Sequence, residues 1–281
     1  MKRAAVIGWP ISHSRSPLIH NYWLRHHGIA GSYERRPVEP QALGHFLRHL
    51  ADEGLTGCNI TIPHKEEALH HLDHVDALAR RLGAVNTVWL QDGKSHGTSS
   101  DGHGFMASLA ASAPNFSVSG SHVLVLGAGG AARAIVGALV DEEAATITIA
   151  NRTLGRAEAL RALGSRTTPV CVVDWPDLPA ALPACDLLVN TTALGMAGQA
   201  ALELDLAPLK PSAVVADIVY TPLETPLLQQ AKARGHRVVP GLGMLLHQAA
   251  TGFELWFGRR PEVTQELYDL VARDIDPDGR S

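Results

Sequence analysis

A short apolar run that ends in a glycine-rich turn constrains the fold of this chain more than any other feature. His122–Leu126 reads as a buried strand, the sequence Gly127-Ala-Gly-Gly-Ala-Ala132 follows at once, and residues 133–140 have helical character. A strand, a glycine turn and a helix in this order form the context that a dinucleotide-binding fingerprint requires. The glycines permit the turn and a close approach to a pyrophosphate, and the helix N-terminus offers N–H groups to the anion. The segment predicts a Rossmann-type fold with these residues at the cofactor: Gly127, Ala128, Gly129, Gly130 and Ala131.

The residues after the next strand indicate which cofactor is bound. Thr146–Ala150 reads as that strand, and it ends about 20 residues after the glycine turn, where such folds place the residue that contacts the ribose. The chain has no carboxylate there; it has Asn151, Arg152 and Thr153, with Arg156 close behind. Guanidinium groups are permanently charged and bond a 2′-phosphate well. We therefore expect NADP rather than NAD, with the alternative that both arginines are ordinary solvated residues.

Composition narrows the class of protein further. The chain has 281 residues, 46% hydrophobic and 19% charged, with a formal charge of −4, which gives no reason to expect nucleic acid or an acidic membrane as a partner. Three cysteines match no zinc spacing and predict reduced thiols, and no apolar run reaches 18 residues. We therefore expect a cytoplasmic protein, and the choice between a monomer and a homodimer stays open.

Fifteen histidines raise the question of a metal site. His70 and His74 are four residues apart on a predicted helix, a spacing that can hold a metal. No Asp or Glu completes a recognisable set of ligands with them, so the segment is interpreted as a polar exposed face without a metal.

The remaining pattern predicts an α/β chain. Strands are expected at 3–8, 32–38, 57–62 and 84–90, helices at 18–27 and 41–53, and a polar loop at 96–102 before a helix at 105–111. The later runs 170–174, 186–192, 213–219 and 237–241 are almost wholly apolar, as parallel strands buried on both faces are. Helices are expected at 245–257 and 261–274, and disorder in the tail 276–281.

Several polar residues lie where these elements begin or end. Ser14 and Ser16 precede the helix that Pro17 starts, where hydroxyls either cap a helix or hold an anion, and capping explains one serine better than two. Asn59 and Thr61 share one face of a strand because side chains alternate along it.

Two charged residues also stand at element ends. Lys65 is expected on the opening turn of a helix, where its charge opposes the helix dipole at a cost of about 0.3–1 kcal/mol, which suggests a use other than stability. A surface lysine without a role remains the alternative. Asp101 can cap the next helix or serve a site.

With these stretches together, the chain resembles the shikimate dehydrogenase family from Val6 to about Phe257. The resemblance rests on the following motifs: Gly8-x-Pro10-x-x-His13-Ser14-x-Ser16-Pro17, Asn59-Ile-Thr61-Ile-Pro63-His-Lys65, Ala84-Val-Asn86-Thr87, Asp101-Gly102, the glycine turn with Asn151-Arg-Thr153, Asn190-Thr-Thr192 with Gly195-Met196, and Gly241-Leu-Gly243-Met244 with Gln248. It implies a reduction of 3-dehydroshikimate to shikimate with NADPH. It also implies a substrate domain (1–104), a Rossmann domain (105–241) and C-terminal helices (242–281) that return to the first domain.

The resemblance assigns roles residue by residue. Lys65 and Asp101 are expected to form the catalytic pair, and Ser14 and Ser16 to bind the substrate carboxylate. The residues expected to bind or border the ring and hydroxyls are Asn59, Thr61, Asn86, Tyr220 and Gln248, and those expected beside the cofactor, in addition to the ones above, are Thr191, Gly241 and Met244. Two positions depart from the family pattern: Ser99-Ser100 stands where Asn-Thr is usual, and Ala193 stands where proline is frequent.

Two other functions fit parts of the pattern. A dehydrogenase of mixed quinate and shikimate specificity is disfavoured by Ser16 and Arg152. A non-catalytic sensor of NADP or shikimate is disfavoured by the presence of both Lys65 and Asp101, because a sensor has no need of that pair.

Overall fold

The computed structural model describes residues 1–277, which form two compact units. Unit 1 comprises Met1–Asp101 and Leu245–Val271, and unit 2 comprises Gly102–Met244 with residues 272–277. Residues 278–281 of the tail expected to be disordered lie outside the described residues. The chain passes from one unit to the other inside three helices, α4 (Asp101–Ser112), α9 (Gly241–Phe257) and α10 (Gln265–Ile275).

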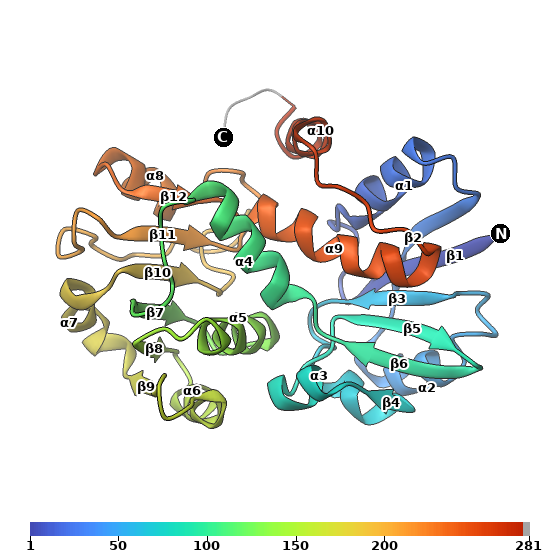
Figure 1. Ribbon diagram of the computed structural model, residues 1–281, viewed down its shortest axis with the longest axis horizontal. Coiled ribbons are helices and arrows are strands. Elements are labelled where there is room, and N and C mark those ends of the chain that lie inside the picture. Colours follow the sequence, from blue (N-terminus) through green and yellow to red (C-terminus); the bar gives the residue numbers. More distant parts are fainter. Residues whose placement is uncertain (278–281) are drawn as a thin grey trace. The chain divides into compact units, whose positions relative to one another are not determined.

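Unit 2 contains a six-stranded parallel sheet in the order β12-β11-β10-β7-β8-β9 (Figure 1). Its strands are β7 (His122–Leu126), β8 (Thr146–Ala150), β9 (Val170–Val173), β10 (Leu187–Asn190), β11 (Val214–Asp217) and β12 (Arg237–Val239). The strand order reverses between β7 and β10, which is the doubly wound arrangement of a Rossmann fold. The predicted fold class is therefore confirmed, and β7 and β8 have the predicted bounds.

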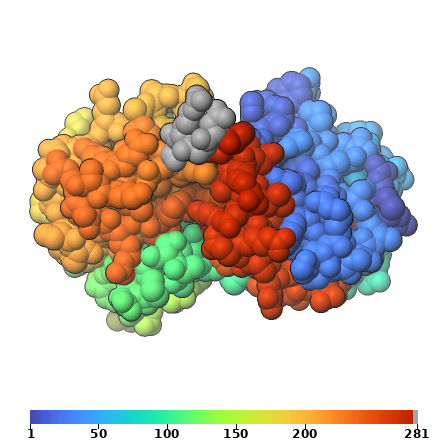
Figure 2. Space-filling model, turned by 90° about the horizontal axis from the view of Figure 1, so that it is seen from above, coloured from blue at the N-terminus to red at the C-terminus, as the bar shows by residue number. Residues whose placement is uncertain are grey.

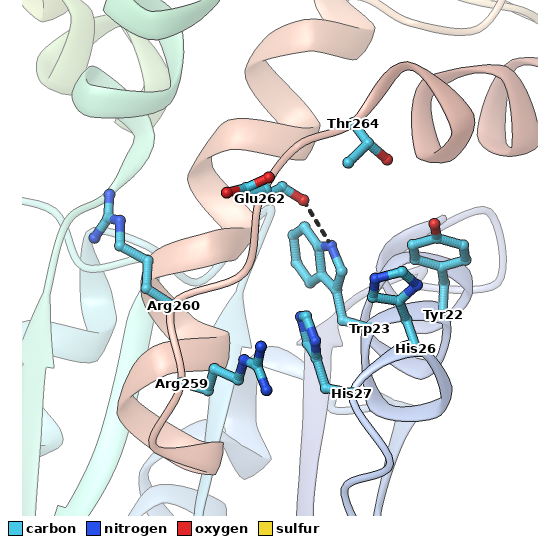
Figure 3. A pocket seen from close by; sticks show the side chains of 8 residues that line it. All are labelled: Tyr22, Trp23, His26, His27, Arg259, Arg260, Glu262 and Thr264. Carbon is cyan, nitrogen blue, oxygen red and sulfur yellow. Dashed lines mark hydrogen bonds between the residues drawn. The ribbon is translucent and has the colours of Figure 1, made fainter.

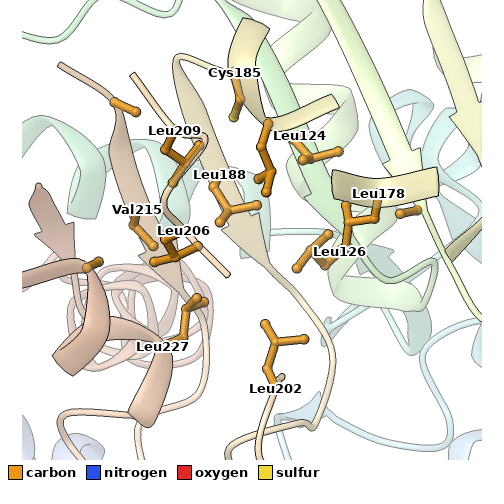
Figure 4. Packing of buried hydrophobic residues seen from close by; sticks show 14 of the residues in the cluster. Leu124, Leu126, Leu178, Cys185, Leu188, Leu202, Leu206, Leu209, Val215 and Leu227 are labelled. Carbon is orange, nitrogen blue, oxygen red and sulfur yellow. The ribbon is translucent and has the colours of Figure 1, made fainter. Parts of the chain in front are cut away.

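Helices connect and cover these strands. They are α5 (Gly130–Asp141), α6 (Leu154–Glu158), α7 (Leu178–Ala181) and α8 (Pro226–Ala233), with 3₁₀ turns η3 (Ala159–Leu163), η4 (Trp175–Asp177) and η5 (Leu182–Ala184). On one side of the sheet, leucines of β7 and β10 pack against Leu178, Leu206 and Leu227 (Figure 4). This packing fixes the strands whose carboxyl ends carry the predicted cofactor residues.

Unit 1 contains a mixed sheet in the order β2-β1-β3-β5-β6-β4. Its strands are β1 (Lys2–Gly8), β2 (Gly31–Pro37), β3 (Gly57–Ile60), β4 (His74–Val75), β5 (Thr87–Gln91) and β6 (Lys94–Thr98). Strand β1 runs parallel to both β2 and β3, whereas β5 is antiparallel to β3 and β6. The helices are α1 (Ser16–His26), α2 (Leu43–Arg48) and α3 (Ala77–Leu82), with 3₁₀ turns η1 (Pro40–Ala42) and η2 (Glu67–His71).

Three local predictions in unit 1 are wrong. The segment 96–98, predicted as loop, belongs to β6; its inward positions are Ser95 and Gly97, so the usual apolar alternation is missing. A side chain at Gly97 would come within 2.5 Å of Leu72. His70 and His74 do not share a helix, since one lies in η2 and the other in β4. The helix predicted at 41–53 is shorter, because it starts as η1 and α2 ends at Arg48.

The C-terminal part of α9 completes the core of unit 1. Trp256 is buried and its Nε1 donates a hydrogen bond to the Val88 carbonyl at 2.8 Å. A side chain at Gly57 would come within 2.0 Å of the Trp256 ring, so glycine at this position of β3 makes room for it. In the view of Figure 2 the C-terminal residues, in red, lie directly against N-terminal residues in blue.

The segment after α9 continues along unit 1 before α10 (Gln265–Ile275) begins. Trp23 of α1 donates a hydrogen bond from Nε1 to the Glu262 carbonyl at 3.1 Å (Figure 3). Among residues 1–277, no helix has both the length and the apolar character needed to cross a membrane.

Candidate functional site

Lys65 and Asp101 meet in unit 1 although 36 positions separate them in the sequence. The Lys65 ammonium donates to Asp101 Oδ2 at 2.5 Å, and 16% and 6% of the two side chains are exposed. Asp101 is the first residue of α4, whereas Lys65 lies in a turn ahead of η2 and not on an α-helix as predicted.

The turn that carries Lys65 is fixed on both sides. The Lys65 carbonyl accepts a hydrogen bond from Val85 N–H at 2.8 Å. The neighbouring His64 is buried and its Nε2 lies 2.7 Å from the Val38 carbonyl, which can only accept, so His64 donates. Burial lowers the pKa of His64, which keeps the ring neutral. The turn is therefore held by hydrogen bonds that do not use the ammonium.

Asn86 holds the other half of the pair. Its Nδ2 donates to Asp101 Oδ1 at 2.8 Å and to Ser100 Oγ at 3.0 Å, while its Oδ1 accepts from Ser100 N–H at 2.8 Å. Ser100 Oγ also lies 3.3 Å from Thr87 Oγ1. Ser100, which departs from the family pattern, thus keeps a hydroxyl that takes part in placing Asp101.

Gln248 reaches the same cluster from α9. Its Oε1 lies 3.3 Å from Asn86 Nδ2, and its own Nε2 donates to the Leu245 carbonyl at 2.9 Å. The other predicted residue from a distant part of the chain, Tyr220, follows β11 in unit 2. Its predicted role stays a prediction.

Ser14 and Ser16 lie at the start of α1. Ser16 is the first residue of the helix, and its N–H donates to Ser14 Oγ at 3.3 Å. The N-cap position is Arg15, whose side chain makes no cap hydrogen bond. Ser16 is buried, with 4% of the residue exposed. This local hydrogen bond accounts for the Ser14 hydroxyl but not for the burial of Ser16.

Asn59 and Thr61 lie at the end of β3. Asn59 is buried and its Nδ2 donates to the Asn86 carbonyl at 3.2 Å and to Thr87 Oγ1 at 3.3 Å. Strand β3 ends at Ile60, so Thr61 lies just beyond it, where its N–H donates to the Ile7 carbonyl at 3.0 Å. The structure thus brings Asn59 into direct contact with the Asn86 cluster.

The glycine turn in unit 2 follows β7 as predicted. Gly127 has φ +107°, and a side chain there would come within 2.5 Å of Thr191 Oγ1. Thr191 in turn donates to the Leu126 carbonyl at 2.7 Å. Gly127 is therefore required by its backbone conformation and by its neighbour on the adjacent strand end. Ala132 is fully buried, as close packing of the helix on the sheet demands.

Gly129 differs from Gly127 in a way that concerns the cofactor. It is the N-cap of α5, with no side-chain cap, and its φ of −91° is open to any residue. A Cβ at Gly129 would meet no protein atom within 4 Å. Neither packing nor backbone conformation requires glycine here, so the bare backbone and the uncapped N-terminus of α5 fit an anion such as a pyrophosphate.

The segment after β8 fits the rest of an NADP molecule. Gly127 N–H donates to the Ala150 carbonyl at 2.8 Å, which places Asn151 beside the glycine turn. Asn151 Nδ2 donates to the Thr153 carbonyl at 2.8 Å and shapes the loop that carries Arg152. Arg152 is exposed and makes no ion pair within residues 1–277, and Arg156 is exposed on α6. The chemistry of these donors suits a 2′-phosphate.

A buried carboxylate organises the next two strand ends of unit 2. Asp217 accepts hydrogen bonds from Asn190 Nδ2 at 3.0 Å, from Val219 N–H at 3.0 Å and from Thr225 Oγ1 at 2.7 Å. Burial outweighs these donors and raises the pKa of Asp217 to about 6. The loops that begin with Thr191 and lead to Tyr220 are held through this group.

Gly241 and Met244 begin α9 within unit 2. A side chain at Gly241 would come within 2.4 Å of the Ile218 carbonyl, and Met244 is buried. Their expected proximity to the cofactor stays a prediction.

Unit 1 contains a separate cavity of about 410 Å³, and Figure 3 shows the side chains that line it. It lies between α1 and the segment that follows α9, and its lining residues are Tyr22, Trp23, His26, His27, Arg259, Arg260, Glu262 and Thr264. None of the predicted site residues lines it. In the described part of the chain, no three His, Cys, Asp or Glu side chains are grouped so that they could hold a metal ion.

Three residues of the unit 1 network were not among the predicted site residues: Tyr33, Thr87 and Ser100. Thr87 and Ser100 directly adjoin predicted residues, so their sequence position was a usable signal. Tyr33 gave none, because it lies on β2 and reaches Asn59 only through the pairing of β2, β1 and β3.

Comparison with known proteins agrees with this geometry. Residues 6–88 match the family model of the shikimate dehydrogenase substrate binding domain, residues 108–203 that of shikimate / quinate 5-dehydrogenase, and residues 241–265 that of the shikimate 5′-dehydrogenase C-terminal domain. A shikimate dehydrogenase (NADP(+)) of Methylocella silvestris is 53% identical over 274 residues, which is 98% of this chain and 97% of the relative.

Solved structures are similar over nearly the whole chain. The shikimate 5-dehydrogenase of Thermus thermophilus in complex with NADP(H) and shikimate has a TM-score of 0.86 and 37% identity, covering 98% of this chain and all of that one (100%). The quinate dehydrogenase of Corynebacterium glutamicum in complex with NAD has a TM-score of 0.87 and 31% identity, covering 96% and 98%. The motifs, the fold and these similarities together show that the chain belongs to the shikimate dehydrogenase family.

Proposed function

We propose that the chain catalyses the reversible reduction of 3-dehydroshikimate to shikimate with NADPH, a step of aromatic amino-acid biosynthesis. The observation that carries this function is the Lys65–Asp101 ion pair, placed among amide and hydroxyl groups in unit 1. Arg152 and the glycine turn of unit 2 support NADP as the cofactor. The relative at 53% identity is named for the same substrate and cofactor.

In this proposal Lys65 moves the proton of the reaction. Bound NADPH supplies a hydride to the ketone carbon, and the ketone oxygen then requires a proton. The Lys65 ammonium donates that proton, and in the opposite direction the amine accepts one from the shikimate hydroxyl. Asp101 stabilises the ammonium and orients it, while Asn86 holds Asp101 through its second carboxylate oxygen. General acid–base catalysis of this kind contributes about 10²–10⁴ in rate.

Binding of the substrate falls to the remaining polar groups. Ser14 and Ser16 are proposed to bind the carboxylate, and the ring and hydroxyls are assigned to Asn59, Thr61, Asn86, Tyr220 and Gln248. Sites built to bond hydroxyl groups reject analogues that lack them by large factors, because buried polar groups are then left unpaired. Such a set of amides and hydroxyls suits a small polyhydroxylated acid.

We further propose that unit 1 binds the substrate and unit 2 the cofactor, in a cytoplasmic protein that is a monomer or homodimer. Cys58, Cys171 and Cys185 are free thiols, which suits a reducing compartment. A net charge of −4 argues against nucleic acid as a partner.

Initial rates test the proposal directly. Shikimate and quinate are each oxidised with NADP and with NAD, and the highest kcat/KM is expected for shikimate with NADP. Lys65→Met serves as the control for contaminating activity. A preference for quinate with NAD, or oxidation of neither substrate by a protein that still binds NADP, would contradict the proposal.

A further inference from the structure

A buried tyrosine supports the Asn59 amide from behind. Tyr33 of β2 is 3% exposed, and its phenol donates a hydrogen bond to Asn59 Oδ1 at 2.6 Å. Burial raises the pKa of Tyr33 well above its usual value, so the phenol stays protonated and remains a donor at any physiological pH.

The contacts of Asn59 determine which way its amide faces. A backbone carbonyl can only accept a hydrogen bond, so the atom 3.2 Å from the Asn86 carbonyl must be the amide nitrogen. The oxygen then faces Tyr33. Asn59 is only 5% exposed, so loss of the phenol would leave a buried acceptor without this donor.

The Tyr33 ring is itself fixed by its surroundings. It stacks on His20, with ring centres 4.0 Å apart and planes at 12°, and its centre lies 5.7 Å from that of Trp256. His20 is fully buried, and burial lowers its pKa to about 3, so it is a neutral flat support. In the sheet, Ala4 of β1 pairs with both Tyr33 and Gly57, and the lack of a side chain at Gly57 leaves room for the Trp256 ring.

The Tyr33 phenol therefore holds a residue of the proposed substrate site in place. Resting on the proposed function, we propose that Tyr33 is a positioning residue for substrate binding. It keeps Asn59 in its binding orientation before shikimate arrives, and it takes no part in proton or hydride transfer.

Tyr33→Phe tests this role, because it removes one oxygen and keeps the ring. The KM for shikimate is expected to rise about 5- to 50-fold, the effect of a buried acceptor losing its donor. The kcat and the KM for NADP should change by less than about twofold, because an interaction made equally in ground and transition states affects KM alone. A merely destabilised protein would lose kcat instead, and a matched fall in kcat would overturn the proposal.

Tyr22→Phe is the matched control. Tyr22 lies on α1 in the same unit, and its buried hydroxyl has no hydrogen-bond partner in the described residues. Its removal should leave the KM for shikimate unchanged. An equal rise in both variants would assign the effect to loss of a phenol in general and would also overturn the proposal.

A double-variant experiment with Asn59 distinguishes a positioning role of the Tyr33 hydroxyl from other effects of the substitution. In an Asn59→Ala background, Tyr33→Phe should raise the KM for shikimate by less than about twofold, since the group through which it acts is gone. If the two losses multiply, Tyr33 does not act through Asn59.

One measurement needs no variant. In the substrate-free wild-type protein, the two Asn59 side-chain amide protons should exchange slowly with water, as observed by nuclear magnetic resonance. Free exchange there would show that the amide is not held and would overturn the inference even if a variant failed to fold. Shikimate oxidation by the wild-type protein is assayed first. Its absence would contradict the proposed function instead.

Discussion

The Lys65–Asp101 ion pair contributes little to the stability of the fold. Both charges are largely buried, and the free energy lost by removing them from water is about as large as the free energy of their attraction. Apolar residues of similar size would often serve a fold as well. The Asn86 and Ser100 hydrogen bonds around Asp101 fit a requirement for defined placement of charge better than a requirement for stability.

If Lys65 passes the proton, Lys65→Met should lower kcat by about 10²–10⁴ while NADP binding, measured by fluorescence, stays within about twofold. Asp101→Asn should also lower kcat steeply. The double variant should be little worse than the poorer single one, since residues that act as a unit are strongly non-additive. Losses that multiply, or a change of KM alone, would make Lys65 a binding residue.

Cofactor choice is also decided at single residues. Arg152→Ala should weaken NADP binding by about 1.5–3 kcal/mol, the range for a hydrogen bond to a charged group, and leave NAD binding nearly unchanged. Calorimetric titration of both cofactors measures this. Arg161→Ala is the control, because Arg161 pairs with Glu158 on the exposed surface of unit 2. An equal loss for NADP and NAD would contradict contact with the 2′-phosphate.

Single residues of the site were predictable where a motif fixes them and unpredictable where pairing across strands does. Lys65 and Asp101 were predicted at element ends, which marks them in the sequence, and Asn86 is marked by its family motif. Tyr33 is an ordinary apolar position of a strand until the sheet order is known.

At the scale of elements, the turn between β7 and α5 combines a glycine that the protein needs with one that it does not. Gly127→Ala should cost roughly 2–4 kcal/mol of stability, because a positive φ disfavours alanine and the new methyl group meets Thr191. Gly129→Ala should leave the melting temperature of the cofactor-free protein unchanged and weaken NADP by roughly 1–3 kcal/mol, the cost of overpacking against the ligand. A Gly129→Ala protein that melts early but binds NADP normally would contradict the contact.

Asp217 ties two strand ends together, and its stability effect depends on pH. Its pKa is raised by burial from 3.8 to about 6, so the folded protein binds this proton more tightly than the unfolded chain does. The contribution to stability is therefore fully present below about pH 4 and is lost as the pH rises through about 6.

Urea unfolding of wild type and Asp217→Asn from pH 4 to pH 7 isolates this group. The wild-type advantage should shrink with rising pH by on the order of 3 kcal/mol. Subtracting the two curves removes the other carboxylates, such as Glu34 and Asp186, whose pKa values are lowered and whose pH dependence has the opposite sign. A difference that is flat with pH would mean that Asp217 does not titrate in this range.

Element prediction succeeded where one physical signal dominates. Most strands of unit 2 are nearly continuous apolar runs, and their predicted bounds lie close to those observed. In unit 1 the sheet is mixed, and β6 presents Ser95 and Gly97 inward because neighbouring side chains such as Leu72 fill the space. The sequence of such a strand shows no apolar face, since the apolar side chains that cover its inner side come from other segments.

At the scale of the whole molecule, unit 2 is nearly one continuous stretch of chain, whereas unit 1 needs residues from both sides of it. Gly57 leaves a space in the sheet of unit 1 that Trp256 fills, and the Val88 carbonyl accepts a hydrogen bond from the Trp256 ring nitrogen. On the ribosome, domains fold as their residues emerge. Residues 102–244, which form nearly all of unit 2, are thus synthesised before Trp256. Until then the sheet of unit 1 exposes an open apolar face, so unit 1 completes its core later although its synthesis begins first.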